Sequence, residues 1–426
     1  MGSIIIVQEA TLNKIINGLR VIEGAAFVAA PLCGMTLAQQ GADVIRFDPI
    51  QGGLDAQRWP ITRAGRSLYW AGLNKGKRSI AVDAHTPEGR DIITSLITAP
   101  GEGNGIFLTN FPTSGWLGYD TLRKRRDDLI MMNVTGNPDG STAVDYTLNC
   151  AVGFPFITGP EHGNCAVNPV NHVLPAWDAI TGITAAMAIL AAERKRRFTG
   201  EGQYVKLPLA DVAFAMLGNL GYIAEVQVND EDRRSSGNYL YGAYGRDFET
   251  RDGRAIYVVA ITKKQWQALG EGTKLAEKLA ILESLLGVDL ALEGNRFKVR
   301  EAISAILAPW FREHTLAEIK EAFEGTAICW GPYQTFRQMV QEDPRCSTEN
   351  SLFNKLEQPG IGTYLTPGSP LQFSNEERMP ARRAPVLGEH TDEVLSEILQ
   401  LSDSQIGVLR DKRVVAGPID LCQEIA

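Results

Sequence analysis

The sequence predicts a mixed α/β protein in which a large domain, built on a parallel sheet with covering helices, precedes a smaller α+β domain. Two observations support this. Short apolar runs alternate with helical patterns through the first 228 residues, and the polar stretch 229–237 ends that alternation. The chain length of 426 residues also favours two domains over one.

The first β-α-β unit indicates the parallel sheet. We expect a strand over Leu19–Glu23, a turn at Gly24, a helix over Ala29–Gln40 and a second strand over Ala42–Phe47. The same alternation then continues, with strands over 79–82, 105–109 and 129–133 and helices over 87–98 and 118–127.

A long alanine-rich helix is expected next, with Pro175 at its first position and a basic end at 193–197. A strand over 204–207 and a helix over 210–226 follow. Beyond the polar boundary we expect strands over 246–250 and 255–260, amphipathic helices over 264–325, a Gly- and Pro-rich region from about 330 and a helix over 391–399.

Asp178 is the candidate catalytic residue, because it lies in the first turn of this long helix. A helix dipole stabilises negative charge at that position, so we expect the carboxylate to be ionised and available as a nucleophile. The alternative is an ordinary preference for acidic residues at helix amino ends.

Composition excludes several classes of protein. The net charge is -8 and the basic residues are dispersed, which argues against a nucleic-acid partner. No apolar run is expected to span a bilayer, and the amino end lacks a signal-peptide pattern, so a cytoplasmic location is expected. The five histidines and six cysteines have no metal-ligand spacing, so no metal is expected.

Nucleotide and hydrolase motifs are also missing. After Gly24 the next glycine is Gly34, so a dinucleotide-binding fingerprint is absent, and there is no G-x-S-x-G sequence. A basic loop carries Lys75, Lys77 and Arg78, which could bind phosphate groups without a metal; a solvated basic turn is the alternative.

Two further segments could contribute to a site. The loop 238–246 contains Tyr241, Gly242 and Gly245; glycines expose backbone N–H groups that could stabilise an oxyanion, although an aromatic-capped hairpin is equally consistent. His172 precedes Asp178 by six residues and could orient a substrate or be structural.

Several stretches together, in this order, resemble the family III CoA-transferases. The resemblance runs from Leu19 to about Val414. Its markers are Gly41–Arg46, Asn74–Ile80, Thr109–Pro112, the helix opening at Asp178, Gly200–Gln203, Tyr244–Gly253 and Leu387–Val394.

The resemblance implies a Rossmann-like large domain formed by 1–228 and 331–426, a small domain at 229–330 between them, and an interlocked homodimer. It implies that Asp178 is the catalytic aspartate and that coenzyme A enters as part of the substrate, with no permanently bound cofactor. It further implies an active-site role for Tyr146 and contacts with CoA by Arg46, Asn74, Lys77, Asn110 and Phe111.

The sequence departs from the family pattern at two places. The stretch after Phe111 is shorter than usual, and the loop 238–246 lacks a run of four glycines. Other phrases, among them 171–178 and 237–248, resemble a branch of the family that moves CoA within one branched unsaturated C5 dicarboxylate. Alternatives are CoA transfer between two different acids, an α-methylacyl-CoA racemase, and a non-catalytic CoA-binding protein.

Overall fold

The structure is a computed structural model that describes residues 15–161 and 169–418. It divides into two compact units. The larger unit takes the described residues up to Leu148, then Leu174–Ile223 and those from Pro344 onward, and the smaller unit takes the remainder. These limits differ from the predicted domain bounds: 149–161, 169–173 and 224–228 group with the smaller unit, and the return to the larger unit begins at Pro344.

A seven-stranded sheet is the centre of the larger unit. Six strands are parallel, and the short carboxyl-terminal strand β12 pairs antiparallel with β3. The predicted mixed α/β class with a large parallel sheet is confirmed. The sheet order is β12 (Val415–Ala416), β3 (Arg78–Val82), β2 (Asp43–Asp48), β1 (Arg20–Gly24), β4 (Ile106–Thr109), β5 (Ile130–Thr135) and β6 (Gln203–Pro208).

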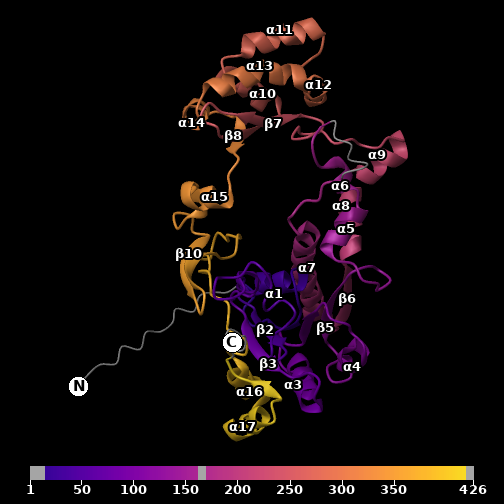
Figure 1. Cartoon of the computed structure of the whole chain (residues 1–426). Helices are drawn as coiled ribbons and strands as arrows, with labels where there is room; N and C mark the ends of the chain where they lie inside the picture. The colour runs from indigo at the N-terminus through magenta and orange to yellow at the C-terminus, as the bar shows by residue number, and fades with distance from the viewer. Residues whose placement is uncertain (1–14, 162–168, 419–426) are drawn as a thin grey trace, which may run out of the picture. The chain divides into compact units, whose positions relative to one another are not determined.

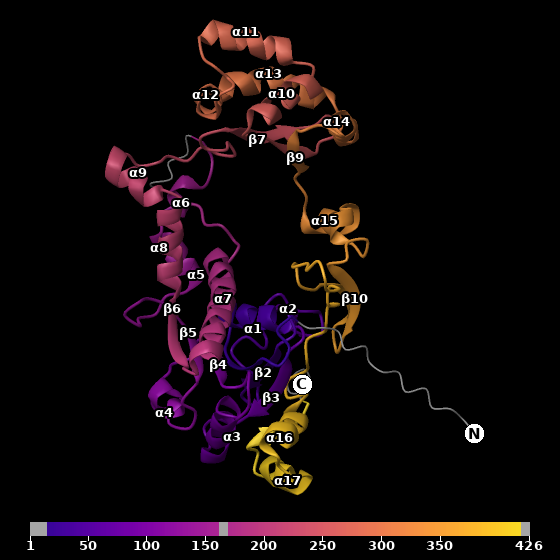
Figure 2. The ribbon, with the colours of Figure 1, turned by 180° about the vertical axis from the view of Figure 1, so that it is seen from behind.

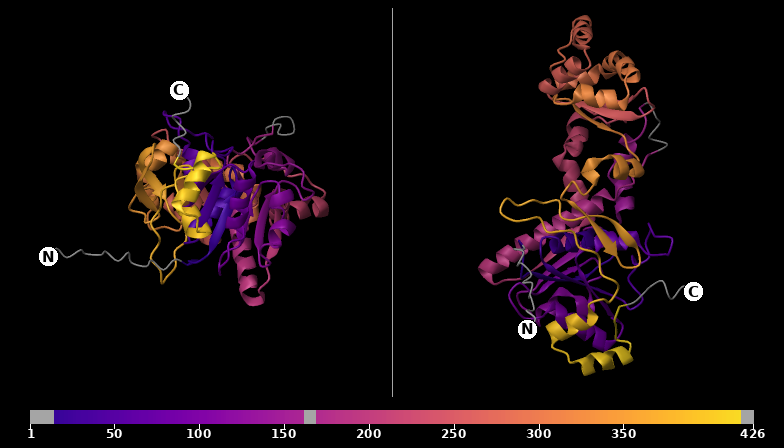
Figure 3. Two further views of the ribbon diagram at one scale, coloured as in Figure 1. Left: turned by 90° about the horizontal axis from the view of Figure 1, so that it is seen from below. Right: turned by 90° about the vertical axis from the view of Figure 1, so that its left-hand side faces the viewer.

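Helices cover both faces of this sheet and create two cores. Alternate strand residues such as Val21 and Leu108 pack against α1 (Ala29–Ala38) and α7 (Ala176–Thr199). The opposite face packs against the helices α3, α4, α16 and α17, and Figures 1 and 3 show α16 and α17 in yellow beside the indigo and purple strands. These helices span Pro87–Ile97, Tyr119–Arg123, Thr391–Leu399 and Asp403–Asp411.

Gly182 fixes the crossing of α7 and α1. A Cβ atom at this position would lie 2.7 Å from the carbonyl oxygen of Ala29 and 3.0 Å from the Cβ of Leu32. The absence of a side chain therefore allows the two helices to approach closely. Asp178 lies one turn earlier on α7, so this crossing brings it to the loop that follows β1.

The expectation that no segment could span a bilayer needs a correction. Among the described residues, α7 is long and apolar enough by length and composition, as is the bent pair α8–α9 taken together. Many small residues raise the mean hydropathy of α7, but 44% of its apolar window is buried inside the protein. A core helix packed on α1 has these same properties.

Several elements differ from the sequence-based expectations. The helix predicted over 210–226 is two helices, α8 (Leu209–Asn219) and α9 (Tyr222–Asn229), because Gly221 has a φ of +82° between them. The helix predicted over 118–127 is shorter, since α4 ends at Arg123 and follows the 3₁₀ turn η1 (Gly115–Leu117). Elements without a prediction are α2 (Leu68–Leu73), α5 (Asp145–Ala151), α6 (Phe154–Ile157), β9 (Cys329–Pro332), α15 (Phe336–Glu342), η2 (Pro344–Cys346), the hairpin β10–β11 (Phe353–Gln358 and Gly362–Pro367), α17 and β12.

The smaller unit has its own sheet and core. Strands β7, β8 and β9 form an antiparallel sheet, and one face is covered by α10–α14 (Figure 2). Tyr244, Phe248 and Phe311 are among its buried aromatic residues. The elements span Tyr244–Glu249, Ala255–Ala260 and Cys329–Pro332 for the strands, and Lys263–Gly272, Ala276–Leu286, Glu293–Lys298, Arg300–Glu313 and Leu316–Phe323 for the helices.

Candidate active site

The amino end of α7 is capped by a carboxylate from another element. Pro175 is the N-cap residue, so Asp178 is the third helical residue and lies in the first turn as predicted. The Oδ2 atom of Asp145 accepts hydrogen bonds from the backbone N–H groups of Trp177 at 2.8 Å and of Asp178 at 3.0 Å. Because Asp145 satisfies these donors, the side chain of Asp178 is not needed as a cap.

The Asp178 carboxylate makes no hydrogen bond or ion pair with any described side chain, and it is half-buried. Burial, followed by repulsion from Asp145, raises the pKa of Asp178 to about 7, and Arg58 opposes this shift. The expectation of a permanently ionised carboxylate is therefore wrong. Burial and a neighbouring like charge outweigh the helix dipole.

Arg58 and Tyr69 are the other polar neighbours of Asp178. The guanidinium of Arg58 lies 5.4 Å from the ring centre of Phe27 and 5.3 Å from that of Tyr69. Burial raises the pKa of Tyr69 to about 12, and the charge of Asp178 contributes to this increase. Among the described residues, the Arg58 cation and the Tyr69 phenol therefore interact electrostatically with Asp178, and Arg58 also lies over Phe27, whose φ is +70°.

Asn110 lies where the strand order of the sheet reverses, between β1 and β4, and it bonds to the loop after β1. Its Oδ1 accepts from the Ala26 N–H at 3.0 Å, and its Nδ2 donates to the Ala26 carbonyl at 2.8 Å. Thr109 donates to the Gly24 carbonyl and accepts from the Phe111 N–H. Crevices at such switch points bind ligands in open α/β sheets. Asn110 joins the loops that follow β1 and β4 at this switch point.

Two of the basic residues that the family resemblance assigns to CoA are buried in a network of charges. We call Glu23, Arg46, Asp48, Asp55 and Lys77 the paired-charge cluster. Arg46 contacts Asp48 at 2.8 Å and Asp55 at 2.8 Å, and Lys77 contacts Glu23 at 2.7 Å. The five side chains are at most 3% exposed.

Asn74 completes this network. Its Oδ1 accepts from Lys77 at 2.9 Å and from Arg46 at 3.2 Å. The second oxygen of Asp55 accepts from the Phe27 N–H at 3.0 Å, which connects the cluster to the loop beside Asp178. The observed partners of Arg46, Asn74 and Lys77 are protein groups. Direct contacts between these three residues and CoA remain a prediction.

The predicted basic loop separates into three different environments. Lys77 belongs to the paired-charge cluster, and Arg78 forms ion pairs with Asp43, Glu393 and Glu397. Lys75 is only 7% exposed, and it makes no hydrogen bond or ion pair with the residues that the structure describes. The loop is therefore not a solvated basic turn.

The remaining predicted site residues are divided between the two compact units. Tyr146 is half-exposed on α5, directly after Asp145, in the larger unit. His172 and the loop with Tyr241, Gly242 and Gly245 belong to the smaller unit. Their roles in the site remain predictions.

The loop 238–246 forms a packed turn within the smaller unit. Gly242 has a φ of +78°, and a Cβ on Gly245 would lie 3.1 Å from the Cβ of Leu240. The guanidinium of Arg233 lies 3.8 Å from the ring centre of Tyr241. The backbone conformation at Gly242 and the close packing at Gly245 each explain locally why glycine is present. Their role as oxyanion donors stays a prediction.

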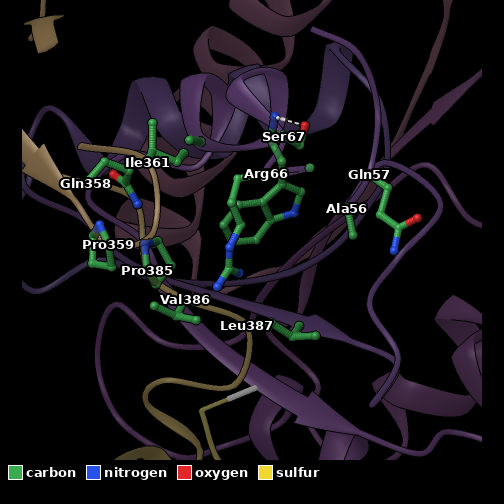
Figure 4. Close-up of a pocket in the computed structure, with 13 residues that line it drawn as sticks. Ala56, Gln57, Arg66, Ser67, Gln358, Pro359, Ile361, Pro385, Val386 and Leu387 are labelled. Atoms are coloured by element: carbon green, nitrogen blue, oxygen red, sulfur yellow. Dashed lines mark hydrogen bonds between the residues drawn. The ribbon is translucent and has the colours of Figure 1, made fainter. Parts of the chain in front are cut away.

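A pocket of about 630 Å³, including the space at its mouth, lies in the larger unit. Figure 4 shows Arg66 reaching into it between Gln57 on one side and Gln358 and Pro385 on the other. Trp70, which also lines it, is the residue after Tyr69 on α2. Its mixture of amide, guanidinium and aromatic groups suits a polar organic ligand. Within 15–161 and 169–418, no three potential metal ligands come together.

Sequence reasoning did not find Asp145, Arg58 or Tyr69. Asp145 begins α5, where an acidic residue has an ordinary local explanation, yet it caps a helix 32 residues later. Nothing in the local sequence around these three residues signals proximity to Asp178. The tertiary structure brings them together: Asp145 caps α7, Arg58 lies between β2 and α2, and Tyr69 lies on α2.

Residues 16–391 match the family model described as CoA-transferase family III, so the chain belongs to that family and is an enzyme of the CoA-transferase class. The chain is 57% identical, over 96% of its length and 99% of the relative, to a 2-methylfumaryl-CoA isomerase of Chloroflexus aurantiacus. It is 26% identical, over 96% of its length and 92% of the relative, to a human succinyl-CoA:glutarate CoA-transferase.

A solved structure supports the fold. A CAIB/BAIF family protein from Brucella suis superimposes with a TM-score of 0.71 at 24% identity, covering 90% of this chain and 99% of that chain. The similarity establishes the mixed α/β fold with a large parallel sheet.

Proposed function

We propose that this enzyme moves CoA between the two carboxyl groups of one substrate molecule and converts 2-methylfumaryl-CoA to 3-methylfumaryl-CoA. The observation that carries the proposal is the half-buried, unpaired carboxylate of Asp178 with a pKa of about 7, in a chain 57% identical to a 2-methylfumaryl-CoA isomerase. A raised pKa makes the ionised form a stronger nucleophile while leaving it populated at neutral pH.

The first half-reaction transfers the acyl group to Asp178. One carboxylate oxygen attacks the thioester carbonyl at C1, and the C–S bond breaks to give a mixed anhydride and CoA thiolate. The thiolate then attacks the Asp178 carbonyl, which releases the free dicarboxylate and leaves an aspartyl-CoA thioester. No proton, metal or oxidant is consumed in these two steps.

The second half-reaction is the reverse on the other carboxyl group. After the dicarboxylate turns in the site, its C4 carboxylate attacks the Asp178 thioester and expels the thiolate, giving a second anhydride. The thiolate attacks the C4 carbonyl, and Asp178 leaves as a carboxylate. The substrate and the product are both CoA thioesters of the same dicarboxylate, so the overall exchange is close to isoenergetic.

The residues around Asp178 have distinct proposed contributions. Arg58 stabilises the carboxylate and then the anionic tetrahedral intermediates, and Tyr69 can donate a hydrogen bond to their oxygens. The N–H groups near Gly242 and Gly245, with Tyr241, form the flap of the site in this proposal, and Tyr146 and His172 line the substrate pocket. The apolar packing around α7 limits access of water, which would hydrolyse both intermediates.

A cytoplasmic homodimer is part of the same proposal. On the larger unit, Ile183, Met187 and Phe214 are 53%, 64% and 48% exposed on the neighbouring helices α7 and α8. Exposed apolar residues gathered on adjacent helices favour a protein interface. Light scattering coupled to gel filtration should give twice the chain mass; a monomer would contradict this part.

The isomerisation is tested with 2-methylfumaryl-CoA as the sole substrate. Chromatography should show 3-methylfumaryl-CoA without an added acid. Product that forms only after a second dicarboxylate is added would instead indicate transfer between molecules, as in the name of the human relative. Solvent deuterium at an α-carbon would indicate racemase chemistry.

The covalent step is tested by trapping. Hydroxylamine or borohydride added during turnover should modify the peptide that contains Asp178. Asp211, an exposed carboxylate in the first turn of α8, is the matched control and should remain unmodified. Absence of any adduct would contradict the proposed nucleophile.

A further inference from the structure

A second pocket in the larger unit is lined by two cationic side chains and by no acidic side chain of the described residues. It measures about 260 Å³ and lies between the end of α1, the loop before β3 and the segment after β11. Its polar side chains come from Gln39, Lys75, Ser369 and Arg382. This volume includes solvent at the open mouth, so an ion would bind at the mouth beside these side chains and not inside a closed cavity.

Lys75 is the central group. It is 7% exposed, and within the described ranges its ammonium group has no hydrogen-bond or ion-pair partner. Burial lowers the pKa of Lys75 to about 8, and no described carboxylate offsets this shift. Buried ammonium groups normally have a partner, because an unpaired one loses its hydration without compensation.

Ser369 supplies a second hydrogen-bond donor that has no acceptor among the described residues. Its Oγ accepts from the side-chain nitrogen of Gln40 at 2.6 Å and from the Leu371 N–H at 3.2 Å. Both lone pairs are therefore used, so the hydroxyl proton can only be donated outward. Within the part of the chain that the structure describes, this proton has no acceptor, and Ser369 is 5% exposed.

Arg382 adds positive charge at the rim. A Cβ on Gly76 would lie 3.7 Å from the Cβ of Arg382, so the arginine stem passes directly over this glycine. The Gly76 N–H donates to the Arg383 carbonyl at 3.0 Å and holds the loop in place. No ion pair of Arg382 occurs among the described residues.

We infer that Lys75, Ser369 and Arg382 form a binding site for a phosphate-type oxyanion, separate from the Asp178 site. Such a ligand offers several anionic oxygens that accept hydrogen bonds, and its negative charge complements the two cations and the hydroxyl donor. The phosphate group can belong to free inorganic phosphate or to CoA itself.

The test measures inorganic phosphate binding by calorimetry at pH 7 and constant ionic strength, with chloride as the reference salt. The wild-type chain should bind phosphate, and Lys75→Met should weaken binding about tenfold or more, because a charge-assisted hydrogen bond is lost. Arg382→Gln, at an exposed rim position, should weaken it by a smaller factor without affecting the fold. Lys124→Met removes an exposed lysine of the same unit and should leave binding unchanged.

Two further measurements complete the test. Phosphate binding that persists with saturating CoA identifies free phosphate as the ligand; competition, with a weaker CoA affinity in Lys75→Met, assigns the phosphate group to CoA. Asp178→Asn should bind phosphate like the wild type, so this inference can fail independently of the proposed function. No phosphate binding above the chloride reference, or equal binding by Lys75→Met, would overturn it.

Discussion

Two groups of carboxylates in the larger unit differ in how far nearby cations balance their negative charge. In the paired-charge cluster, Arg46 and Lys77 contact the carboxylates of Glu23, Asp48 and Asp55 at 2.7–2.9 Å through their closest atoms. Asp145 and Asp178 are called the carboxylate pair; among the described residues Arg58 is the cation that opposes the raised pKa of Asp178. Paired charges fix a structure, whereas a poorly compensated carboxylate retains the reactivity that catalysis needs.

The largest effect is expected at the reactive member of the carboxylate pair. Asp178→Asn should reduce kcat by roughly 10⁴-fold or more, because no oxygen nucleophile remains to carry the acyl group. Steady-state kinetics checks this, with Asp211→Asn as the matched first-turn control that retains activity. An Asp178→Asn enzyme with an undiminished rate would remove the basis of the proposed function.

The same variant should change stability in a pH-dependent way. The folded-state pKa of Asp178 is raised from 3.8 to about 7, so wild-type stability falls as pH increases through that window and the whole penalty is present at pH 8. Asp178→Asn should therefore be more stable than wild type at pH 8, by roughly 2 kcal/mol after allowance for partial exposure. The difference should largely vanish near pH 4. Denaturant unfolding at both pH values measures this, and equal differences would contradict the raised pKa.

Breaking the paired-charge cluster should affect stability more than chemistry. Arg46→Met leaves the carboxylates of Asp48 and Asp55 buried without their cation, which should cost about 3–5 kcal/mol of unfolding free energy. The control is Arg125→Met: its exposed ion pair with Asp91 should contribute about 0–1 kcal/mol. Equal effects of the two substitutions would show that the cluster is not a structural element.

A smaller effect is expected from neutralising the other carboxylate of the pair. Asp145→Asn keeps an oxygen that can accept from Trp177 and Asp178 but removes the charge that raises the Asp178 pKa. The acidic limb of the kcat/KM profile, expected near pH 7 in the wild type, should shift down by about one unit. A limb that does not move would indicate that burial alone sets this pKa.

The smallest effect is expected at the opposing cation. Arg58→Gln removes the charge that lowers the Asp178 pKa, so the same limb should shift upward, by about half a unit. The pH profile of kcat/KM measures this, and a downward shift would contradict the assigned sign. Opposite shifts of the acidic limb in the Asp145 and Arg58 variants would show that these two charges set the pKa of Asp178.

The site could be predicted only in part from the sequence. The first-turn position of Asp178 follows from a local pattern, Pro175 before an alanine-rich run, and the structure agrees within one residue. The family resemblance assigned Arg46 and Lys77 to CoA contacts, but a one-dimensional pattern does not reveal that both are buried against carboxylates. Lys75 lies two residues before Lys77, but its environment is different. No rule based on residue spacing predicts which of the two lysines is paired with a carboxylate.

The alternation of strands and helices, the mixed α/β class and the position of the candidate nucleophile were determined by the sequence alone, because periodicity and helix-start residues act over a few neighbours. The protonation of Asp178 was decided by the tertiary structure. It depends on Asp145, whose carboxylate caps α7, and on Arg58, which lies between β2 and α2. Burial and electrostatic repulsion act through space, so residues far apart in the chain set the charge of this carboxylate.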